Sequence, residues 1–375
     1  MLLSPVERLA RQVACCGTCG GRQGCAKGGM LHCFKTLTTA AALWLLATTA
    51  CAQEPAPIAQ QSFESYLATL AQRARAERVS EATIARMMTS LTLDERVISL
   101  DRAQPGTPSR PGVFPPLRDY IARHVDDARI NGGRRVAAET QGITARLERQ
   151  YGVPGSILIA IFGHETAYGQ VTGSFDLARS LATLAWEGRR RALFESEFIA
   201  LMKIADKNRY SREQLRGSWA GAFGYPQFLP SVYLRLATDG DGDGRADLFS
   251  SRADTLASIA NYFRDAGWRR GQPWGVVASV PAGFDWSMLQ TRVVSPVCPQ
   301  VHDRHSVWRT VREWRQLGVQ PQRAIGEDVM ASLFQPDGPG SPAYLLTGNY
   351  RAILEYNCSN YYAMSVGLLA DAIGS

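Results

Sequence analysis

The sequence predicts an α+β protein that is mainly helical and carries one small β-rich lobe. Apolar residues recur at helical spacing in successive segments between residues 62 and 266, as expected for helices that bury one face. Residues 272–345 instead combine prolines and glycines with short apolar runs, which is typical of strands joined by turns. The chain has 375 residues and 45% hydrophobic content. That is enough for one large domain or for two to three lobes around a sizeable core.

The start of the chain is expected to direct export rather than to fold. Residues 37–50 form an uncharged, largely apolar run that follows a short, weakly basic region after Met30. A run of this length is short for a membrane span and suits a signal peptide, and residues 50–52 supply the small side chains that cleavage needs. We therefore expect 30–52 to be a signal peptide, with 1–29 lying upstream of the true start.

Lipid attachment at Cys51 is an alternative way of processing the same segment. Thr48 stands where a lipoprotein signal would usually carry leucine. Cleavage near Gln53 predicts a periplasmic protein, whereas a lipid on Cys51 would anchor the protein to the outer membrane. In both cases residues 53–61, which contain two prolines, are expected to form a short tether.

Cysteine usage agrees with export. Six of the eight cysteines lie in or before the signal segment, and the mature chain retains only Cys298 and Cys358. Two lone cysteines in an oxidising compartment predict one disulfide, with two buried thiols as the alternative.

The charge of the mature chain is mild. Residues 1–52 carry five basic residues and one acidic residue, so removing them lowers the formal charge from +7 to +3. A weakly cationic surface fits an anionic polymer or a component of the cell envelope. The sequence shows no basic run with interleaved aromatic residues, so nucleic acid is not an expected partner.

The spacing of apolar residues and the positions of prolines and glycines predict the individual helices, strands and loops. Gln104–Pro116 holds five prolines and two glycines and is predicted to be a loop. Pro154 suits the first turn of a helix through Ile157. Helices are predicted at 62–90, 117–130, 136–151, from about 154, at 176–205, 253–266 and 361–373. In the β-rich lobe the candidate strands are the apolar runs Trp274–Val280, Ala343–Leu346 and Tyr350–Tyr356.

Glu165 is the leading candidate for a catalytic residue. It follows the apolar stretch Ile157–Phe162. A carboxyl group beside such a surface is usually either paired or used for chemistry. Desolvation favours the protonated form of a carboxyl group, which suits a general acid that gives a proton to a poor leaving group. From this segment alone, a capped or ion-paired glutamate at the end of a core helix is the alternative.

An acidic loop predicts a calcium site. Acidic side chains occupy its positions 1, 3, 5 and 9, and Gly244 at position 6 permits a sharp turn. Position 12 is Ser250 where glutamate is expected, and Asp254 lies slightly further on. The candidate ligands are Asp239, Asp241, Asp243, Arg245, Asp247 and Asp254. A bound ion would have a structural role, and a solvated Asp-Gly turn is the alternative.

Other hydrolase signatures are incomplete. His164-Glu165 would begin a zinc-protease motif only with a histidine at position 168, which is Tyr168. Ser218 is misplaced for a nucleophile elbow. Aromatic and amide side chains are instead dense around and downstream of Glu165, a combination that can hold sugar rings and N-acetyl groups. For each aromatic residue, core packing is the alternative. These aromatic and amide residues include Tyr168, Trp219, Phe223, Tyr225, Gln227, Phe228, Asn261 and Tyr262, and a second set from Tyr356 to Tyr362.

Five motifs in order resemble the membrane-bound lytic transglycosylase B family, which is glycoside hydrolase family 103 of the bacterial murein lytic transglycosylases. The motifs are residues 163–169, 179–185, 217–231, the acidic loop and 356–366. The resemblance runs from about residue 62 to the end, so 62–375 would be the catalytic domain. It implies a helical lobe at about 62–150, a lysozyme-like core at about 151–271 plus 347–375, and the small β-rich lobe at about 272–346.

The resemblance also implies a role for each matching residue. Glu165 matches the catalytic glutamate. Arg189 and Arg190 match a pair that meets the peptide stem. The residues implied to line the substrate cleft are Ser218, Gln227, Tyr262, Tyr356, Asn357 and Tyr362. The family's calcium loop matches 239–254, and no cofactor is implied for catalysis. The departures from the family pattern are Pro226, Ser250 and Cys358.

The implied activity is cleavage of the β-1,4 bond between N-acetylmuramic acid and N-acetylglucosamine. Because no second acidic residue is paired with Glu165 in the motifs, we expect one carboxyl group to act first as acid and then as base, closing a 1,6-anhydro ring. A hydrolytic muramidase and an inactive peptidoglycan-binding scaffold are the alternatives. Glycan strands are the expected partner, together with proteins of cell-wall synthesis or division. A membrane partner is expected only if Cys51 is lipidated.

Overall fold

The computed structural model describes residues 61–104, 116–289, 301 and 305–375. The predicted upstream segment, the signal peptide, Cys51, nearly all of the tether and Cys298 lie outside these residues. Within the described ranges, no helix is both long and apolar enough to cross a bilayer.

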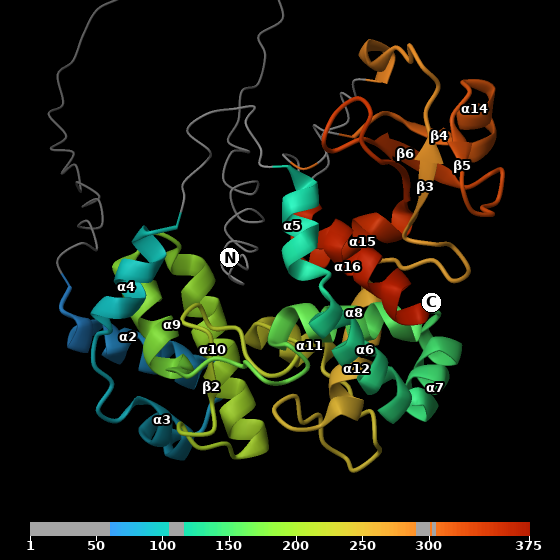
Figure 1. Ribbon diagram of the computed structural model, residues 1–375. Helices are drawn as coiled ribbons and strands as arrows, with labels where there is room; N and C mark the ends of the chain where they lie inside the picture. The colour runs from blue at the N-terminus through green and yellow to red at the C-terminus, as the bar shows by residue number, and fades with distance from the viewer. Residues whose placement is uncertain (1–60, 105–115, 290–300, 302–304) are drawn as a thin grey trace, which may run out of the picture.

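One layer contains helices from the start of the described chain, which pack against helices from the middle of the chain. Helices α2 (Phe63–Ala76), α3 (Glu81–Met88) and α4 (Glu95–Arg102) pack against α9 (Leu177–Glu187) and α10 (Arg191–Asn208) (Figure 1). The side chains of Ser62, Ser80 and Asp94 accept a backbone N–H at the start of α2, α3 and α4, which satisfies donors that a helix leaves unpaired. Each helix buries its apolar face in this layer.

A second group of helices surrounds α8 (Gly155–Thr166). Helices α6 (Asp127–Glu139), α7 (Gln141–Tyr151), α12 (Arg252–Asp265) and α16 (Asn360–Gly374) contact α8, and α5 (Leu117–His124) packs on α16 (Figure 1). Every residue from Ile157 to Thr166 is buried, as expected for a helix that is apolar on all sides. Residues 62–150, predicted as one helical lobe, therefore contribute to two different groups of helices.

Four predicted helices are divided in the structure: 62–90 breaks between α2 and α3, 136–151 breaks at Thr140 between α6 and α7, and two others break at local stop signals. The segment 117–130 breaks after α5, and Asp126 caps α6 by accepting the N–H of Arg129 at 2.7 Å. The segment 176–205 breaks at Gly188, which has a φ of 94°. Glycine adopts this left-handed conformation without a steric cost, so it commonly ends helices. Pro154 precedes α8 as its N-cap residue, one position earlier than expected.

The β-rich lobe contains a five-stranded antiparallel sheet with its own apolar core. Its strand order is β4 (Trp308–Thr310), β6 (Met330–Phe334), β7 (Ala343–Thr347), β3 (Gly275–Ser279) and β5 (Gln320–Pro321). Helix α14 (Val311–Gln316) packs beside it, and η2 (Trp286–Leu289) precedes the undescribed stretch. The indole of Trp314 is fully buried and donates to the carbonyl of Ala331 at 2.9 Å. The expectation of a mainly helical α+β fold is confirmed.

The chain enters and leaves this lobe through neighbouring strands. Strand β3 pairs with β7 from Gly275↔Leu346 to Ala278↔Ala343. The N–H of Thr347 donates to the carbonyl of Trp274 at 3.1 Å. The two connections to the helical part therefore lie side by side, above α15 and α16 in Figure 1.

One predicted strand is wrong. Tyr350–Tyr356 lies within helix α15 (Gly348–Tyr356) rather than in the sheet. Its aromatic and branched residues suit a strand, but the hydroxyl of Thr347 accepts the N–H of Asn349 at 3.1 Å and starts a helix. Asn349 also donates from its side chain to the carbonyls of Arg269 and Gln272, at 2.9 and 2.8 Å. These bonds fix the start of α15 on the loop after α12.

Candidate active site

Glu165 lies in the last turn of the buried helix α8. The residue is 7% exposed. Directly after the helix, Ala167 and Tyr168 have φ values of 49° and 61°, a left-handed conformation that is uncommon for residues other than glycine. Such strain persists where the surroundings fix it and is frequent at functional sites. Here the hydroxyl of Tyr168 donates to the carbonyl of Arg129 at 2.6 Å and holds the turn against α6.

Tyr362 is hydrogen-bonded to Glu165. Its phenolic hydroxyl donates to Oε1 of Glu165 at 2.6 Å, and both groups are buried. Tyr362 lies in the first turn of α16, where the side chain of Ser359 caps the helix. The ring of His164 lies 5.7 Å from that of Tyr362. The carboxyl group is thus oriented by a neutral donor within an aromatic environment.

The segment 216–231 brings Ser218 and Gln227 to the end of α8. It begins with β2 (Arg216–Gly217), which pairs with β1 (Phe175–Asp176). The Gln227 side-chain amide donates to the carbonyls of Thr172 and Gly224, at 3.2 and 2.9 Å. The hydroxyl of Ser218 accepts the N–H of Ala222 at 3.0 Å.

Among the described residues, one side-chain hydrogen bond ties this segment directly to α8. The hydroxyl of Thr166, the residue after Glu165, donates to the carbonyl of Tyr225 at 3.0 Å. Gln227 itself has a φ of 51°, so its neighbours must hold it in a left-handed conformation.

Tyr356 and Tyr262 support the same segment from α15 and α12. The hydroxyl of Tyr356 donates to the carbonyl of Pro226 at 2.7 Å, and that of Tyr262 donates to the carbonyl of Glu355 at 2.8 Å. Their ring centroids lie 4.7 Å apart. Pro226, a departure from the family pattern, therefore supplies a carbonyl that positions Gln227 next to it.

Asn357 is the one predicted cleft residue with an unsatisfied buried atom. It is 2% exposed, and its Oδ1 has no hydrogen-bond partner among the described residues. A buried amide oxygen without a donor is costly, and a ligand N–H group could satisfy it. Cys358, which follows, is buried and disulfide-bonded; its predicted partner Cys298 lies outside the described residues.

Arg189 and Arg190 both bind the buried carboxylate of Asp101. The Nε of Arg189 lies 2.9 Å from Asp101 Oδ2, and Arg190 pairs with the other oxygen. Burial lowers the pKa of Arg190, and the charge of Asp101 opposes that shift. The side chain of Arg190 is 9% exposed and that of Arg189 is 42% exposed. Arg190 thus joins α10 to α4, while Arg189 keeps one side open to solvent.

Three of the six predicted calcium ligands come together. Carboxylate oxygens of Asp239, Asp241 and Asp254 lie within 4.8 Å of one another. Asp239 accepts the N–H groups of Gly242 and Gly244, at 2.6 and 2.8 Å, as in a loop that wraps around a cation.

The other two predicted carboxylate ligands, Asp243 and Asp247, lie outside this group. Asp243 accepts the N–H of Arg245 at 2.8 Å. Asp247 accepts the N–H of Phe249 at 2.8 Å and also binds the hydroxyl of Ser250. Both acids therefore stabilise the loop itself.

Asp254 carries the strongest sign of a cation site. It is fully buried, and burial raises its pKa, while the charges of Asp241 and Asp239 add to that shift. Backbone N–H groups of Gly240 and Asp247 bind its two oxygens, each at 2.7 Å, and oppose the shift. A divalent cation would remove the repulsion among the three acids, so these residues fit calcium.

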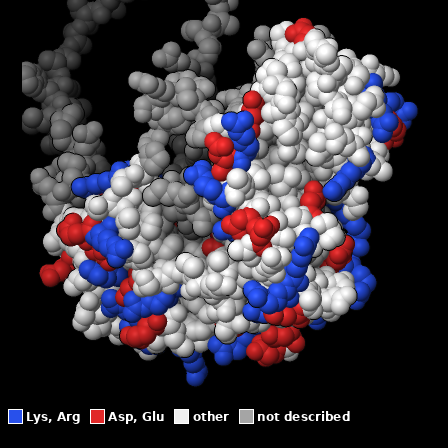
Figure 2. Space-filling model, in the orientation of Figure 1, with Lys and Arg blue, Asp and Glu red and all other residues white. Residues whose placement is uncertain are grey.

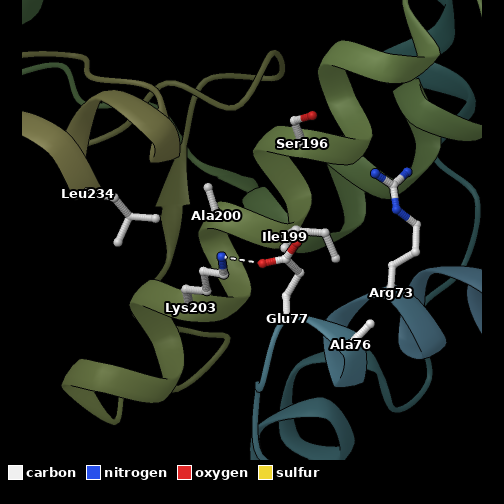
Figure 3. Close-up of a pocket in the computed structure, with 8 residues that line it drawn as sticks. All are labelled: Arg73, Ala76, Glu77, Ser196, Ile199, Ala200, Lys203 and Leu234. Carbon is white, nitrogen blue, oxygen red and sulfur yellow. Dashed lines mark hydrogen bonds and ion pairs between the residues drawn. The ribbon is translucent and has the colours of Figure 1, made fainter.

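A separate groove of about 310 Å³ lies between α2, α10 and α11 (Pro230–Leu236) (Figure 3). Glu77 and Lys203 pair across it at 2.7 Å. None of the predicted site residues lines it.

Comparison with known proteins identifies the family. The Transglycosylase SLT domain family matches residues 62–371. The chain belongs to this family. Its sequence is 30% identical over 286 residues to membrane-bound lytic murein transglycosylase B of Escherichia coli K12, covering 75% of this chain and 74% of that protein. The resemblance expected from the five motifs is confirmed.

Solved structures extend the similarity of this transglycosylase-domain protein. SltB3 from Pseudomonas aeruginosa in complex with NAG-NAM-pentapeptide has a TM-score of 0.75 and 35% identity, over 84% of this chain and 80% of that one. Escherichia coli Slt35 in complex with calcium has a TM-score of 0.67 and 26% identity, over 82% and 92%. The expected lysozyme-like fold is confirmed.

Sequence reasoning missed two buried carboxyl groups beside predicted site residues of this transglycosylase-domain protein: Asp101, which binds Arg189 and Arg190, and Glu197. Glu197 is 3% exposed and contacts Ser231, at the end of the segment that carries Ser218 and Gln227. The available signal was a glutamate beside the apolar run Phe198–Met202, the same type of signal that singled out Glu165.

Proposed function

We propose that this protein cleaves the β-1,4 bond between N-acetylmuramic acid and N-acetylglucosamine without water, leaving 1,6-anhydro-N-acetylmuramic acid ends. The observation that carries the proposal is the buried Glu165, oriented by Tyr362 at the end of an apolar helix. Membership of a transglycosylase family supports it, as do the complexes of SltB3 with peptidoglycan fragments.

Glu165 would act twice in one turnover. It first donates its proton to the glycosidic oxygen, and the bond from that oxygen to C1 of the muramic acid breaks. The substrate's N-acetyl group stabilises the resulting cationic centre. The Glu165 carboxylate then removes the proton of the C6 hydroxyl, whose oxygen bonds to C1. The enzyme regains its proton, so the atoms balance without water as a reactant.

The residues around Glu165 supply orientation. By holding Oε1, Tyr362 fixes the plane of the carboxyl group. Ser218, Gln227 and Asn357 would bind sugar and acetamido groups, and the unsatisfied Oδ1 of Asn357 suits an acetamido N–H. Arg189, with its exposed side, would meet the carboxylates of a peptide stem. Arg190 would act through Asp101, which it helps to hold in place.

We further propose that Asp239, Asp241 and Asp254 hold a structural calcium ion. Their clustered oxygens and the buried position of Asp254 support it, and Slt35 has been solved with calcium. Glu165 needs no metal for the proton transfers described above. The ion would hold the loop rather than take part in the reaction.

Export to the periplasm follows from the predicted signal peptide and is part of the same proposal. On the face shown in Figure 2, acidic and basic side chains are intermingled, mainly over the lower half. Glycan strands are the proposed substrate, and proteins of cell-wall synthesis or division remain expected partners.

Digestion of purified sacculi tests the reaction. Mass spectrometry of the released muropeptides should find anhydro ends, and Glu165→Gln should lower turnover by several orders of magnitude while glycan binding persists. Reducing ends would instead indicate a hydrolytic muramidase. An absence of product would indicate a binding scaffold, and near-normal activity of Glu165→Gln would refute the role of Glu165.

A further inference from the structure

Glu197 is a buried acid that the proposed chemistry does not use. It lies in the middle of α10 and is 3% exposed, and the neighbouring Phe194 and Phe198 are buried as well. Burial raises its pKa, whereas its hydrogen bonds to Ser231 oppose that shift. A carboxyl group in such a place is costly unless its contacts are needed.

Both oxygens of Glu197 bind the same residue. The N–H of Ser231 donates to Oε2 at 2.9 Å, and the Ser231 hydroxyl contacts Oε1 at 2.6 Å. Ser231 lies in the first turn of α11, whose own N-cap residue, Leu229, makes no side-chain cap bond. Glu197 therefore caps α11 from another helix and fixes its first turn to α10.

Ser231 ends the segment that holds Gln227 in the cleft. The intervening residues are buried, and Phe228 exchanges two backbone hydrogen bonds with Phe223, at 2.9 and 3.1 Å. Gln227 has a φ of 51°, which a residue with a side chain adopts only when its flanks are held. The Phe223–Phe228 bridge closes the turn around Gln227, and the bonds from Ser231 to Glu197 anchor the chain that leaves this turn.

We infer that Glu197 is a positioning residue for the cleft, acting through Ser231 to hold Gln227 in its left-handed conformation beside the end of the catalytic helix. The inference rests on the proposed function for its effect on turnover. Its effect on the conformation of segment 217–231 does not depend on that function.

Glu195 offers a matched control two residues away. It lies on the same helix and accepts the hydroxyl of Tyr66 at 2.6 Å while pairing with Arg73. These partners belong to α2, whereas the partner of Glu197 belongs to α11. Glu195→Ala therefore breaks a comparable carboxyl contact without touching the segment that carries Gln227.

A double-mutant cycle separates positioning from general loss of stability. Turnover is compared below the unfolding temperature for the wild type, Glu197→Ala, Gln227→Ala and the double variant. We expect Glu197→Ala to lower kcat about 10-fold with little change in KM, but less than about 2-fold in the Gln227→Ala background. Glu195→Ala should stay within about 2-fold of wild type. Glu197→Gln, which keeps an acceptor for the Ser231 N–H, should restore most of the activity.

Additive losses in the cycle, or an equal loss in Glu195→Ala, would overturn the inference. If Glu197→Ala does not fold, Ser231→Ala takes its place. Ser231 is exposed, and this variant loses the hydroxyl bond to Glu197 but keeps the backbone N–H bond. We then expect kcat to fall about 3-fold.

Hydrogen exchange of the 217–231 peptide provides a readout that needs no turnover. Exchange should rise in Glu197→Ala or Ser231→Ala and stay unchanged in Glu195→Ala. Unchanged protection in the first two would reject the positioning role even if the protein proves to have another activity. A wild type that yields no product while this peptide still loosens would contradict only the proposed function.

Discussion

The phenolic hydroxyl of Tyr362 donates to Oε1 of Glu165 across 2.6 Å, although the two residues lie 197 positions apart in the chain. The contact joins the end of α8 to the first turn of α16. A neutral donor can orient a carboxyl group whether that group carries its proton or has given it away. This suits an acid that must later act as a base.

Tyr362→Phe removes that hydroxyl and leaves the ring. We expect kcat to fall about 10-fold, which corresponds to about 1.4 kcal/mol of transition-state stabilisation, because the carboxyl group loses its fixed orientation. Steady-state kinetics on isolated glycan strands measures the effect. Tyr66→Phe is the control, since Tyr66 makes the same kind of bond to Glu195. Tyr66→Phe should lower the melting temperature and leave kcat unchanged. If Tyr66→Phe and Tyr362→Phe lower kcat equally, the role of Tyr362 is contradicted.

Gly163→Ala should destabilise the protein by about 1–3 kcal/mol through overpacking. A Cβ atom at Gly163 would lie 2.6 Å from the ring of Tyr168, whose hydroxyl is fixed on the carbonyl of Arg129. Thermal unfolding measures the loss. The control is Gly142→Ala on α7, where a Cβ meets nothing within 4 Å and a gain of about 0.5–1 kcal/mol is expected. A melting temperature for Gly163→Ala at or above the wild type would show that Tyr168 can move.

Glu197 should make stability depend on pH in a defined direction. Its pKa is raised above the ordinary 4.5 by burial, so the folded state binds a proton more tightly than the unfolded state. The stabilisation is complete below the unfolded pKa and is lost as the pH rises through the folded one. The free energy of unfolding of the wild type minus that of Glu197→Gln should therefore be larger at about pH 4 than at about pH 8.

Glu77→Gln provides a control of opposite sign for this measurement. The bond and the charge of Lys203 lower the pKa of Glu77, so that pair stabilises the folded state at higher pH and the effect is lost as the pH falls. Because Glu77 is exposed, salt should weaken its effect. Calorimetry of the three proteins across pH distinguishes them, and parallel profiles for wild type and Glu197→Gln would show that Glu197 does not titrate in this range.

Calcium should raise the melting temperature by an amount that grows with the ratio of its free concentration to its Kd. An ion at 100 times its Kd adds about 2.7 kcal/mol to the free energy of unfolding. Asp254→Asn should abolish this gain, because Asp254 is the buried member of the cluster. Asp243→Asn, outside the cluster, should retain part of it. If calcium stabilises Asp254→Asn as much as the wild type, the ion binds elsewhere.

The parts of the site that could be predicted are those with a local signal. The apolar run before Glu165 and the spacing of the aspartates in the acidic loop are contiguous in the sequence, and the structure places them on a buried helix and in a clustered loop. Asp254 could also be predicted as a ligand, because it follows that loop closely in the sequence. Its buried position could not be predicted, because it depends on the packing of α12.

The remaining contacts are non-local, and periodicity does not encode them. Nothing near Glu165 in the sequence indicates Tyr362, and nothing near Glu197 indicates Ser231. Residues 350–356 were predicted as a strand because their side chains suit a sheet, whereas the cap at Thr347 and the bonds of Asn349 to the loop after α12 make them helical. In each case a contact between distant segments decides the outcome.

The adjacent entry and exit of the β-rich lobe fix where its chain leaves and rejoins the helical part. Because Trp274 and Thr347 are already hydrogen-bonded neighbours, the distance that the helical part must span is independent of how much chain lies between them. Changes in the length of the loops within the lobe therefore need not alter the spacing between α12 and α15.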